Sequence, residues 1–159
     1  MDRYQVLPFW LAEQPLAVAL EQVVRVLPAL QSMPLPGAPE TICGLVNVRG
    51  QLLPVVDLAR RFGWGMPALS LWQPFIWLRS SKRDLLLPVQ RVAPVSSYGA
   101  DDFTPATDPR VPSSLLLGAV RSADGLLLIQ DVEQLLSQAD EDRLSELLAN
   151  GEGAADAAH

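Results

Sequence analysis

The chain has 159 residues, of which 49% are hydrophobic and 19% are charged, and its formal net charge is −6. This composition excludes disorder over most of the chain, and the length is enough for one domain, or two small joined ones, with a hydrophobic core. The single cysteine, Cys43, excludes a disulfide framework and fits a reducing cytoplasm.

The charge is unevenly distributed along the chain. Residues 1–130 carry 11 Lys and Arg against 10 Asp and Glu, whereas residues 131–159 carry one Arg against eight acidic residues. A nearly neutral body with an acidic end argues against nucleic-acid binding, which needs a basic surface. No run of 18 apolar residues predicts a membrane span, and the apolar N-terminal stretch is interrupted at Glu13–Pro15, unlike a secretion signal.

In chain order, the first half predicts four strands. Tyr4–Ala12 and Leu16–Val26 are apolar segments joined by a turn at Glu13–Pro15, and Ile42–Val48 and Gln51–Val56 predict a hairpin. Between these pairs, the segment QSMPLPGAPET contains three prolines and a glycine, which predict a long surface connection.

The hairpin carries an arginine, Arg49, at the apex of an otherwise apolar ribbon. Asn47 at the first turn position and Gly50 at the fourth predict a type I turn that ends in a glycine with positive φ. After the hairpin, Asp57 is placed to cap a short helix, LARRF, which ends at Gly63.

The second half predicts four more strands around a long loop at Ser96–Ser114. The strands are Leu71–Arg79, Asp84–Val95, Leu115–Arg121 and Leu126–Gln130. Asp131 is expected to cap a helix, VEQLLSQ, and a last amphipathic helix, EDRLSELLAN, follows it. We expect residues 151–159 to form a disordered tail.

The two halves resemble each other. The segment GLVNVRGQLLPVVDL aligns without a gap with GAVRSADGLLLIQDV, so that Gly44 matches Gly118 and Asp57 matches Asp131. Earlier pieces repeat in the same order, because PFWL resembles PFIWL and LEQVVRV resembles VQRVAPV. Two copies of a unit built from short strands predict an all-β chain with short helices and two small antiparallel barrels.

Strands that are apolar on both faces, such as Leu85–Val89, predict extra burial between the barrels or against a partner. We place the first subdomain at about residues 15–69 and the second at about residues 1–14 and 70–138, within a domain of residues 1–150. The similarity of the halves leaves open whether strands exchange between them.

Residues that could support catalysis are few. The only histidine, His159, lies in the expected tail, and Cys43 begins an apolar strand, which favours a buried structural thiol. One Cys and one His cannot form a metal site and no glycine-rich phosphate loop occurs, so we expect no metal or cofactor. Asp57 and Asp131 could form a carboxylate pair, but each follows a strand and precedes a helix, which favours N-caps.

The four tryptophans favour binding over catalysis. Trp10 and Trp77 occupy equivalent strand positions and are expected in the core. Trp64 and Trp72 flank the segment between the halves, and each could belong to the core or to a contact surface.

The segment PGAPETICGLVNVRGQLLPVVDLARRFG resembles the signature of the CheW-like coupling domain of bacterial chemosensory systems. The hallmarks are a proline-rich approach, a Gly–x–x–Asn–x–Arg–Gly hairpin, a strand with a proline, and an Asp–Leu helix start. The matching positions are Pro36, Gly37, Pro39, Gly44, Asn47, Arg49, Gly50, Pro54, Asp57 and Leu58. The resemblance extends over residues 4–148.

The resemblance implies two intertwined five-stranded SH3-like barrels followed by a C-terminal helix, and a protein that is not an enzyme. Such domains couple the cytoplasmic tip of a chemoreceptor to the regulatory domain of a CheA-type histidine kinase. The receptor helix lies in an apolar groove between the barrels, and the kinase domain docks end to end against one barrel. We therefore expect a cytoplasmic protein, monomeric alone, that is recruited to membrane receptor arrays.

The resemblance also implies partner-binding residues. The family arginine that matches Arg49 lies in the receptor and kinase contact region, and Asn47 and Gly50 shape the turn that holds it. The alternative is that Arg49 closes its own turn or covers apolar surface with its stem. The candidates for the groove, each of which could also be a core residue, are Leu20, Val23, Leu45, Val46 and Val89.

The sequence departs from the family in two places. The family commonly has Val–x–Glu–Val in the second strand, whereas residues Val23–Val26 put Arg25 where the glutamate is expected. In the second half, a common Val–Asp is Val89–Gln90. If Arg25 lies near Arg49, the usual opposite-charge pair becomes a like-charge pair, which is unfavourable unless solvent or an acidic partner group intervenes.

Three alternatives remain open at this point. The chain could serve another sensory pathway, such as motility or second-messenger control, with a different receptor and kinase. It could be a small-ligand-binding barrel, although interior residues that are mostly Leu and Val leave few polar groups for a ligand. The least favoured alternative is a hydrolase that uses Asp57 or Asp131.

Overall fold

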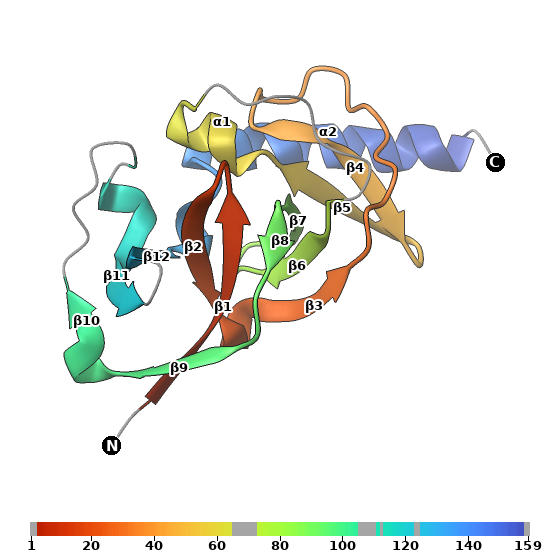
Figure 1. Cartoon of the computed structure of the whole chain (residues 1–159). Helices are drawn as coiled ribbons and strands as arrows, with labels where there is room; N and C mark the ends of the chain where they lie inside the picture. Colours follow the sequence, from red (N-terminus) through yellow and green to blue (C-terminus); the bar gives the residue numbers. More distant parts are fainter. Residues whose placement is uncertain (1–2, 65–72, 105–110, 112, 123–124, 158–159) are drawn as a thin grey trace.

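The computed structural model describes residues 3–64, 73–104, 111, 113–122 and 125–157. The strands form two sheets, here called sheet A and sheet B (Figure 1). Sheet A contains β1 (Arg3–Leu11), β2 (Gln14–Ala19), β8 (Arg91–Val92), β9 (Ser96–Gly99), β10 (Phe103–Thr104), β11 (Leu116–Ser122) and β12 (Gly125–Gln130). Sheet B contains β3 (Val23–Leu27), β4 (Ile42–Val48), β5 (Gln51–Val56), β6 (Phe75–Arg79) and β7 (Asp84–Pro88).

Helical segments are short except at the C-terminus. The α-helices are α1 (Leu58–Phe62) and α2 (Gln138–Ala157). The 3-10 turns are η1 (Leu20–Gln22), η2 (Ala100–Asp102), η3 (Ser113–Leu115) and η4 (Val132–Gln134). The prediction of a mostly β chain with two barrel-like sheets and a C-terminal helix is therefore confirmed.

The two sheets exchange their central hairpins. Sheet B has the order β3-β6-β7-β5-β4, and in sheet A the strands β9, β1, β2, β12 and β11 follow one another in the same way. The hairpin β6–β7 comes from the second half of the chain and completes the sheet of the first half, where Val55 pairs in parallel with Leu86. The hairpin β1–β2 does the reverse, since Leu128 pairs in parallel with Leu16.

This exchange places the subdomain limits differently from the sequence-based expectation. The chain changes sheet at η1 and again between β7 and β8, instead of near residues 15 and 70. The apolar segment Leu16–Val26, predicted as one strand, is accordingly divided into β2 and β3, which belong to different sheets. The two halves would resemble each other whether or not they exchange hairpins. Their similarity therefore could not locate the limits of the subdomains.

The core has one shared layer and one interior for each sheet. The shared cluster joins Phe9 of sheet A to Leu87 of sheet B and to Leu144 of α2. Smaller clusters fill the interior of sheet A, around Val120, and of sheet B, around Leu86. Successive residues of β7 thus enter different clusters, which explains why the LLLPV segment is apolar on both faces.

A tight turn joins β1 to β2. Leu11 pairs with Gln14, and the two turn residues, Ala12 and Glu13, have φ values of 52° and 63°. Non-glycine residues seldom adopt this left-handed conformation. Gln90 stabilises it, because the Glu13 N–H donates to Gln90 Oε1 at 3.0 Å and Gln90 Nε2 donates to the Glu13 carboxylate. The turn predicted at Glu13–Pro15 therefore begins one residue earlier.

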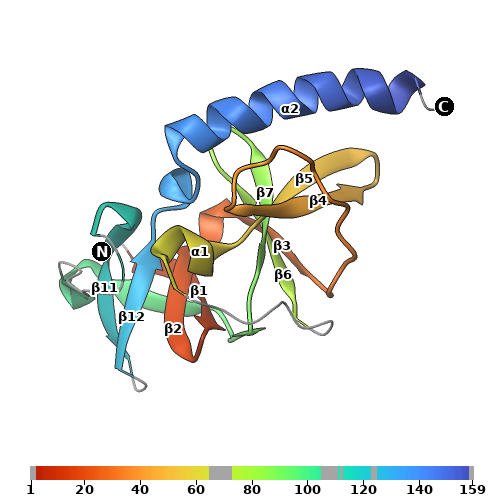
Figure 2. The same cartoon turned by 90° about the horizontal axis from the view of Figure 1, so that it is seen from above.

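Helix α2 lies alongside β7 and the loop before β4, and its last turns extend past the sheets (Figure 2). The sequence predicted a helix from residue 141 to 150 and disorder after it, but α2 runs from Gln138 to Ala157. Alanine has the highest helix propensity, so the alanines near the end of the chain favour this continuation. Leu144 anchors the helix in the shared core.

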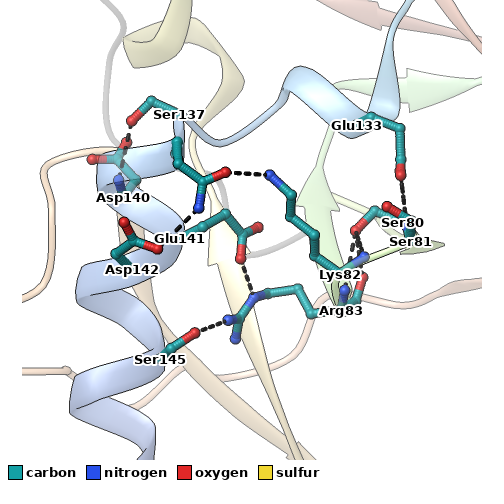
Figure 3. Close-up of polar contacts among 11 residues, drawn as sticks. Ser80, Ser81, Lys82, Arg83, Glu133, Ser137, Asp140, Glu141, Asp142 and Ser145 are labelled. Carbon is teal, nitrogen blue, oxygen red and sulfur yellow. Dashed lines mark hydrogen bonds and ion pairs between the residues drawn. The ribbon is translucent and has the colours of Figure 1, made fainter.

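A polar network fixes α2 to the β6–β7 turn (Figure 3). Arg83 Nε contacts Glu141 Oε2 at 2.6 Å, and Arg83 Nη2 donates to Ser145 Oγ at 2.6 Å. The side chains of the ion pair are only 15% and 8% exposed. Lys82 Nζ donates to Gln138 Oε1 at 2.9 Å. This network, here called the α2 clamp, holds a turn of sheet B against the helix that follows sheet A.

Candidate functional site

The β4–β5 hairpin ends in a two-residue turn with Arg49 at its apex. Val48 pairs with Gln51, and Arg49 and Gly50 have φ values of 53° and 87°. Two positive φ values are typical of a type I′ turn, which matches the twist of the flanking strands. The predicted type I turn over Asn47–Gly50 is therefore wrong, although Asn47 Oδ1 does accept a hydrogen bond of 2.7 Å from the Gly50 N–H.

The side chain of Arg49 is exposed and has no internal role in the part of the chain that the structure describes. It makes no hydrogen bond or ion pair with any described residue. Asn47 and Gly50 close the turn through their own hydrogen bond. The guanidinium is therefore available for a partner at the tip of a rigid ribbon.

Strand β3 forms an edge of sheet B and exposes three consecutive residues. Val24 is 36% and Val26 40% exposed, and Arg25 between them is exposed without a hydrogen bond or ion pair to the described residues. Successive strand residues normally face opposite sides, but the register with β6 shifts between Val23 and Arg25. This β-bulge creates an exposed strip, here called the β3 strip, of Val24, Arg25 and Val26.

Arg25 and Arg49 belong to opposite edges of the strand order of sheet B. Arg25 lies on β3 at one edge of sheet B, and Arg49 lies at the tip of the hairpin that forms the other edge. Both residues are exposed, Arg25 on β3 and Arg49 in the β4–β5 turn.

The groove candidates fall into two groups. Leu45, Val46 and Val89 are buried, so their side chains stabilise the fold and cannot be reached by a partner in this conformation. Leu20 and Val23 are half-buried and remain possible contact residues. The predictions for these three residues are corrected because Val46 and Val89 pack into core clusters and Leu45 is 7% exposed. The exposed valines Val24 and Val26 were missed because a β-bulge leaves no clear signal in the sequence.

The structure bears out the N-caps predicted at Asp57 and Asp131. Asp57 Oδ1 accepts a hydrogen bond of 3.1 Å from the Arg60 N–H at the start of α1, which ends at Gly63 with φ 80°. Asp131 Oδ1 accepts one of 3.1 Å from the Glu133 N–H. Asp131 caps the 3-10 turn η4 instead of a longer helix. Both carboxylates thus have a structural role that requires no catalytic function.

A family model described as a CheW-like domain matches residues 5–140. The chain belongs to the CheW-like domain family. It is 22% identical over 152 residues to "Chemotaxis protein CheW" of Treponema pallidum, which covers 92% of this chain and 89% of that protein. It is 24% identical over 140 residues to the protein of the same name from Thermotoga maritima, covering 87% and 91%.

A solved structure has the same fold as this CheW-like domain. It is the "scaffolding protein TtCheW from Thermoanaerobacter tengcongensis", which superimposes with a TM-score of 0.79 at 23% identity and covers 88% of this chain and 92% of that chain. The likeness spans both sheets, so the two-barrel architecture expected from the repeat is a property of the family.

Cys43 of this CheW-like domain is not an activated nucleophile. The residue as a whole is exposed, unlike the predicted buried residue, but its thiol is partly shielded from solvent, and this burial raises the pKa of the thiol to about 11. The negative charge of Asp57 raises the pKa further, while Arg60 lowers it. A thiol with so high a pKa is almost entirely protonated at neutral pH, and the thiolate is the reactive form.

Two tryptophans expected in the core of this CheW-like domain, Trp10 and Trp77, are half-buried, and Trp77 packs against the core cluster of sheet B. Arg91 lies over the ring of Trp10, 4.3 Å from its centroid. Trp77 Nε1 donates to Asp84 Oδ2 at 3.0 Å. Trp64 is half-buried and packs against Phe62 and the shared core. Trp72 lies outside the described residues.

Asp84 organises the start of β7 in this CheW-like domain. Arg79 Nε and Nη2 donate to its two oxygens at 2.9 and 3.0 Å, and this hydrogen bonding holds the pKa of the Asp84 carboxyl below its ordinary value. Among the described residues no group of three His, Cys, Asp or Glu could hold a metal ion. None of the described helices combines the length and apolarity needed to cross a bilayer.

Proposed function

We propose that this CheW-like domain is a non-catalytic adaptor that couples a chemoreceptor cytoplasmic tip to a CheA-type histidine kinase. Family membership supports this, and so do the names of the similar proteins, which are a chemotaxis protein and a scaffolding protein. Its place would be the cytoplasm, at membrane receptor arrays.

The observation that carries the proposal is the exposed guanidinium of Arg49. A type I′ turn fixes the backbone at the arginine, so the backbone there loses little conformational freedom when a partner binds. A guanidinium presents a planar set of donors that matches a carboxylate or two carbonyl groups. Arginine is also enriched among the residues that dominate the energy of protein interfaces.

The β3 strip supplies a second contact of complementary type. Val24 and Val26 offer exposed apolar surface, and Arg25 between them makes no ion pair with any described residue. A partner that places an acidic residue between two apolar ones fits this pattern. The half-buried residues Leu20 and Val23 would extend the apolar contact.

Reconstitution tests the proposal. A receptor cytoplasmic fragment, a CheA-type kinase and this chain are mixed, and kinase co-sedimentation and autophosphorylation are measured. We expect the wild-type chain to increase both. Arg49→Ala and Arg25→Glu are each expected to weaken assembly about tenfold, as for residues at the centre of an interface.

Arg121→Ala is the matched control, because Arg121 is an exposed arginine on β11 without a hydrogen bond or ion pair in the described structure. It should assemble like the wild type. If the wild-type chain neither co-sediments with the other two proteins nor changes kinase activity, the adaptor function is rejected. The same assay with kinases of motility and second-messenger pathways decides which pathway the chain serves.

A further inference from the structure

A tryptophan and an arginine are cross-strand partners in each of the two sheets. In sheet A, Trp10 of β1 pairs with Arg91 of β8, and in sheet B, Trp77 of β6 pairs with Arg25 of β3. Side chains of directly opposite strand residues point to the same face and lie close enough to interact. Both tryptophans are half-buried and both arginines are exposed. The two pairs can therefore be compared directly.

The pair in sheet A is occupied with itself. The central carbon of the Arg91 guanidinium lies over the ring of Trp10, 4.3 Å from the ring centroid. A cation in this position is attracted by the electrons of the indole face and covers that face. Arg91 thus has a partner within the chain, and one face of Trp10 is not open to another protein.

The pair in sheet B is not closed in this way. Its register is regular from Arg25 to Leu27, so Arg25 and Trp77 share a face of the sheet. Among the described residues no cation lies over the Trp77 ring, and Arg25 makes no hydrogen bond or ion pair. Trp77 packs against the core cluster of sheet B but remains half-buried. The Arg25 guanidinium and part of the Trp77 ring are therefore available to another protein.

Asp84 fixes the orientation of the Trp77 ring. Trp77 Nε1 donates to Asp84 Oδ2 at 3.0 Å, and the side chain of Asp84 is only 9% exposed. Arg79 Nε and Nη2 donate to the same carboxylate at 2.9 and 3.0 Å, and Gln51 Nε2 does so at 3.4 Å. A ring held in this way loses little freedom when a partner binds. Because Arg79 neutralises Asp84, the charge of Arg25 remains for a carboxylate from outside the chain.

Building on the proposed adaptor function, we propose that Trp77 is a contact residue of the partner-binding surface and that, with Arg25, it selects the segment that binds there. This segment carries an Asp or Glu next to a large aliphatic residue. The carboxylate binds the Arg25 guanidinium, which suits it in shape and charge, and the aliphatic side chain packs on the exposed part of the Trp77 ring. Tryptophan and arginine are enriched among the residues that dominate interface energies.

The indole N–H signals of the isotope-labelled full chain test this contact without changing the protein. A receptor cytoplasmic fragment and the regulatory domain of a CheA-type kinase are added in separate titrations, and Trp77→Phe assigns the signal of Trp77. With the partner whose binding Arg25→Glu weakens, the Trp77 signal should shift or broaden. The Trp10 signal should keep its position, since Trp10 belongs to sheet A and Arg91 covers its ring.

Matched variants measure the strength of the contact. Trp77→Phe should weaken binding of that partner about fivefold, whereas Trp10→Phe should leave it within about twofold of the wild type. Phenylalanine retains most of the ring at either position, and thermal unfolding shows whether both variants are folded. Combined with Arg25→Ala, Trp77→Phe should weaken binding less than the product of the two single effects, because both residues hold one segment. Trp10→Phe combined with Arg25→Ala should give the product.

The outcomes separate this inference from the adaptor function. If a partner binds but the Trp10 and Trp77 signals respond alike, or if Trp77→Phe binds like the wild type, the contact is rejected and the adaptor function stands. If neither protein binds the wild-type chain, the adaptor function is rejected and the contact with it. A Trp77 signal that changes with the concentration of the chain alone would assign the Arg25–Trp77 pair to a second copy and would also overturn the inference.

Discussion

At the scale of single residues, Gly44 and Gly118 show why the repeat keeps glycine at one position. A Cβ on Gly44 would lie 2.5 Å from the Met33 carbonyl oxygen. Met33 is held there because it exchanges backbone hydrogen bonds of 2.7 and 2.8 Å with Leu45. In the second half, a Cβ on Gly118 would lie 3.3 Å from the Thr104 carbonyl oxygen. Each glycine thus lets a hydrogen-bonded neighbouring backbone segment lie close alongside its strand.

The two contacts differ in severity, which gives a matched comparison. Gly44→Ala should lower the free energy of unfolding by about 2–3 kcal/mol, because a backbone atom must move. Gly118→Ala should cost about 1 kcal/mol or less, since a small shift relieves its contact. Urea denaturation of both variants measures the difference. Equal losses of unfolding free energy would mean that the backbone at Met33 moves easily to accommodate the added Cβ.

Cys43 gives a prediction about pH. Its thiol has a pKa of about 11, chiefly through burial and then through the charge of Asp57. The alkylation rate should therefore rise about tenfold per pH unit up to pH ~10, where an ordinary thiol has already levelled off. Asp57→Asn removes the negative charge and should shift the rate profile to lower pH, while asparagine still caps α1. A plateau near pH 9 in the wild-type chain would contradict the prediction.

Local sequence signals predicted the roles of capping residues better than they predicted which apolar residues are buried. The caps at Asp57 and Asp131 follow from a polar residue between a strand and a helix, and the structure has both. The burial of Leu45, Val46 and Val89 could not be predicted, because an apolar strand residue looks the same whether it faces a core or a groove. The positive φ of Gly50 was predicted from the motif and is confirmed, whereas the positive φ of Arg49 was not predicted.

At the scale of elements, the α2 clamp joins parts that are distant in the sequence. Arg83 at the β6–β7 turn contacts Glu141 and Ser145 of α2, and the neighbouring Ser81 N–H donates to the Glu133 carboxylate at 2.7 and 2.9 Å (Figure 3). None of these pairings could be predicted from the sequence, because long-range polar partners follow no period. The length of α2 was likewise underestimated, since glycines at 151 and 153 suggested an end.

The ion pair in the clamp predicts unequal effects for two glutamates on the same helix. Glu141→Gln leaves Arg83 without its counter-ion in a mostly buried place and should cost about 2 kcal/mol of unfolding free energy. Glu146→Gln removes an exposed pair with Arg143 and should cost about 0.5 kcal/mol or less. Chemical denaturation compares the two variants. Similar small losses would show that the clamp does not hold α2.

The hydrophobic pattern of the sequence does not reveal strand β3 as a separate element. The sequence joins β2 and β3 into one apolar segment, but the chain crosses between sheets at η1. The β-bulge that follows exposes Val24 and Val26 together with Arg25. β-Bulges are frequent at sheet edges and next to functional sites, which agrees with the contact proposed for the β3 strip.

At the scale of the whole molecule, the exchange of hairpins binds the two halves together. Sheet B needs β6–β7 between β3 and β5, and sheet A needs β1–β2 between β9 and β12. The repeat predicted two barrels but not the exchange, since both arrangements bury the same apolar residues. The shared core, which takes residues from both sheets and from α2, adds to the mutual dependence.

Dividing the chain tests this dependence. Residues 1–68 and residues 69–159 expressed separately should each lack the central hairpin of a sheet, and circular dichroism should show little ordered β structure. Expressed together, with a tag on one fragment, they should co-purify in equal amounts and regain a cooperative thermal transition. A folded fragment on its own would show that the exchanged hairpins are not essential.

The exchange also fixes the order in which the protein can be completed during synthesis. A nascent chain that ends before β6 has no strand to place between β3 and β5, so sheet B cannot close until β7 has left the ribosome. Sheet A is completed later, because the β1–β2 hairpin must pair with β12, which is the last strand to be translated. The β1–β2 hairpin is therefore made first but is among the last segments to gain its outer neighbours, β9 and β12.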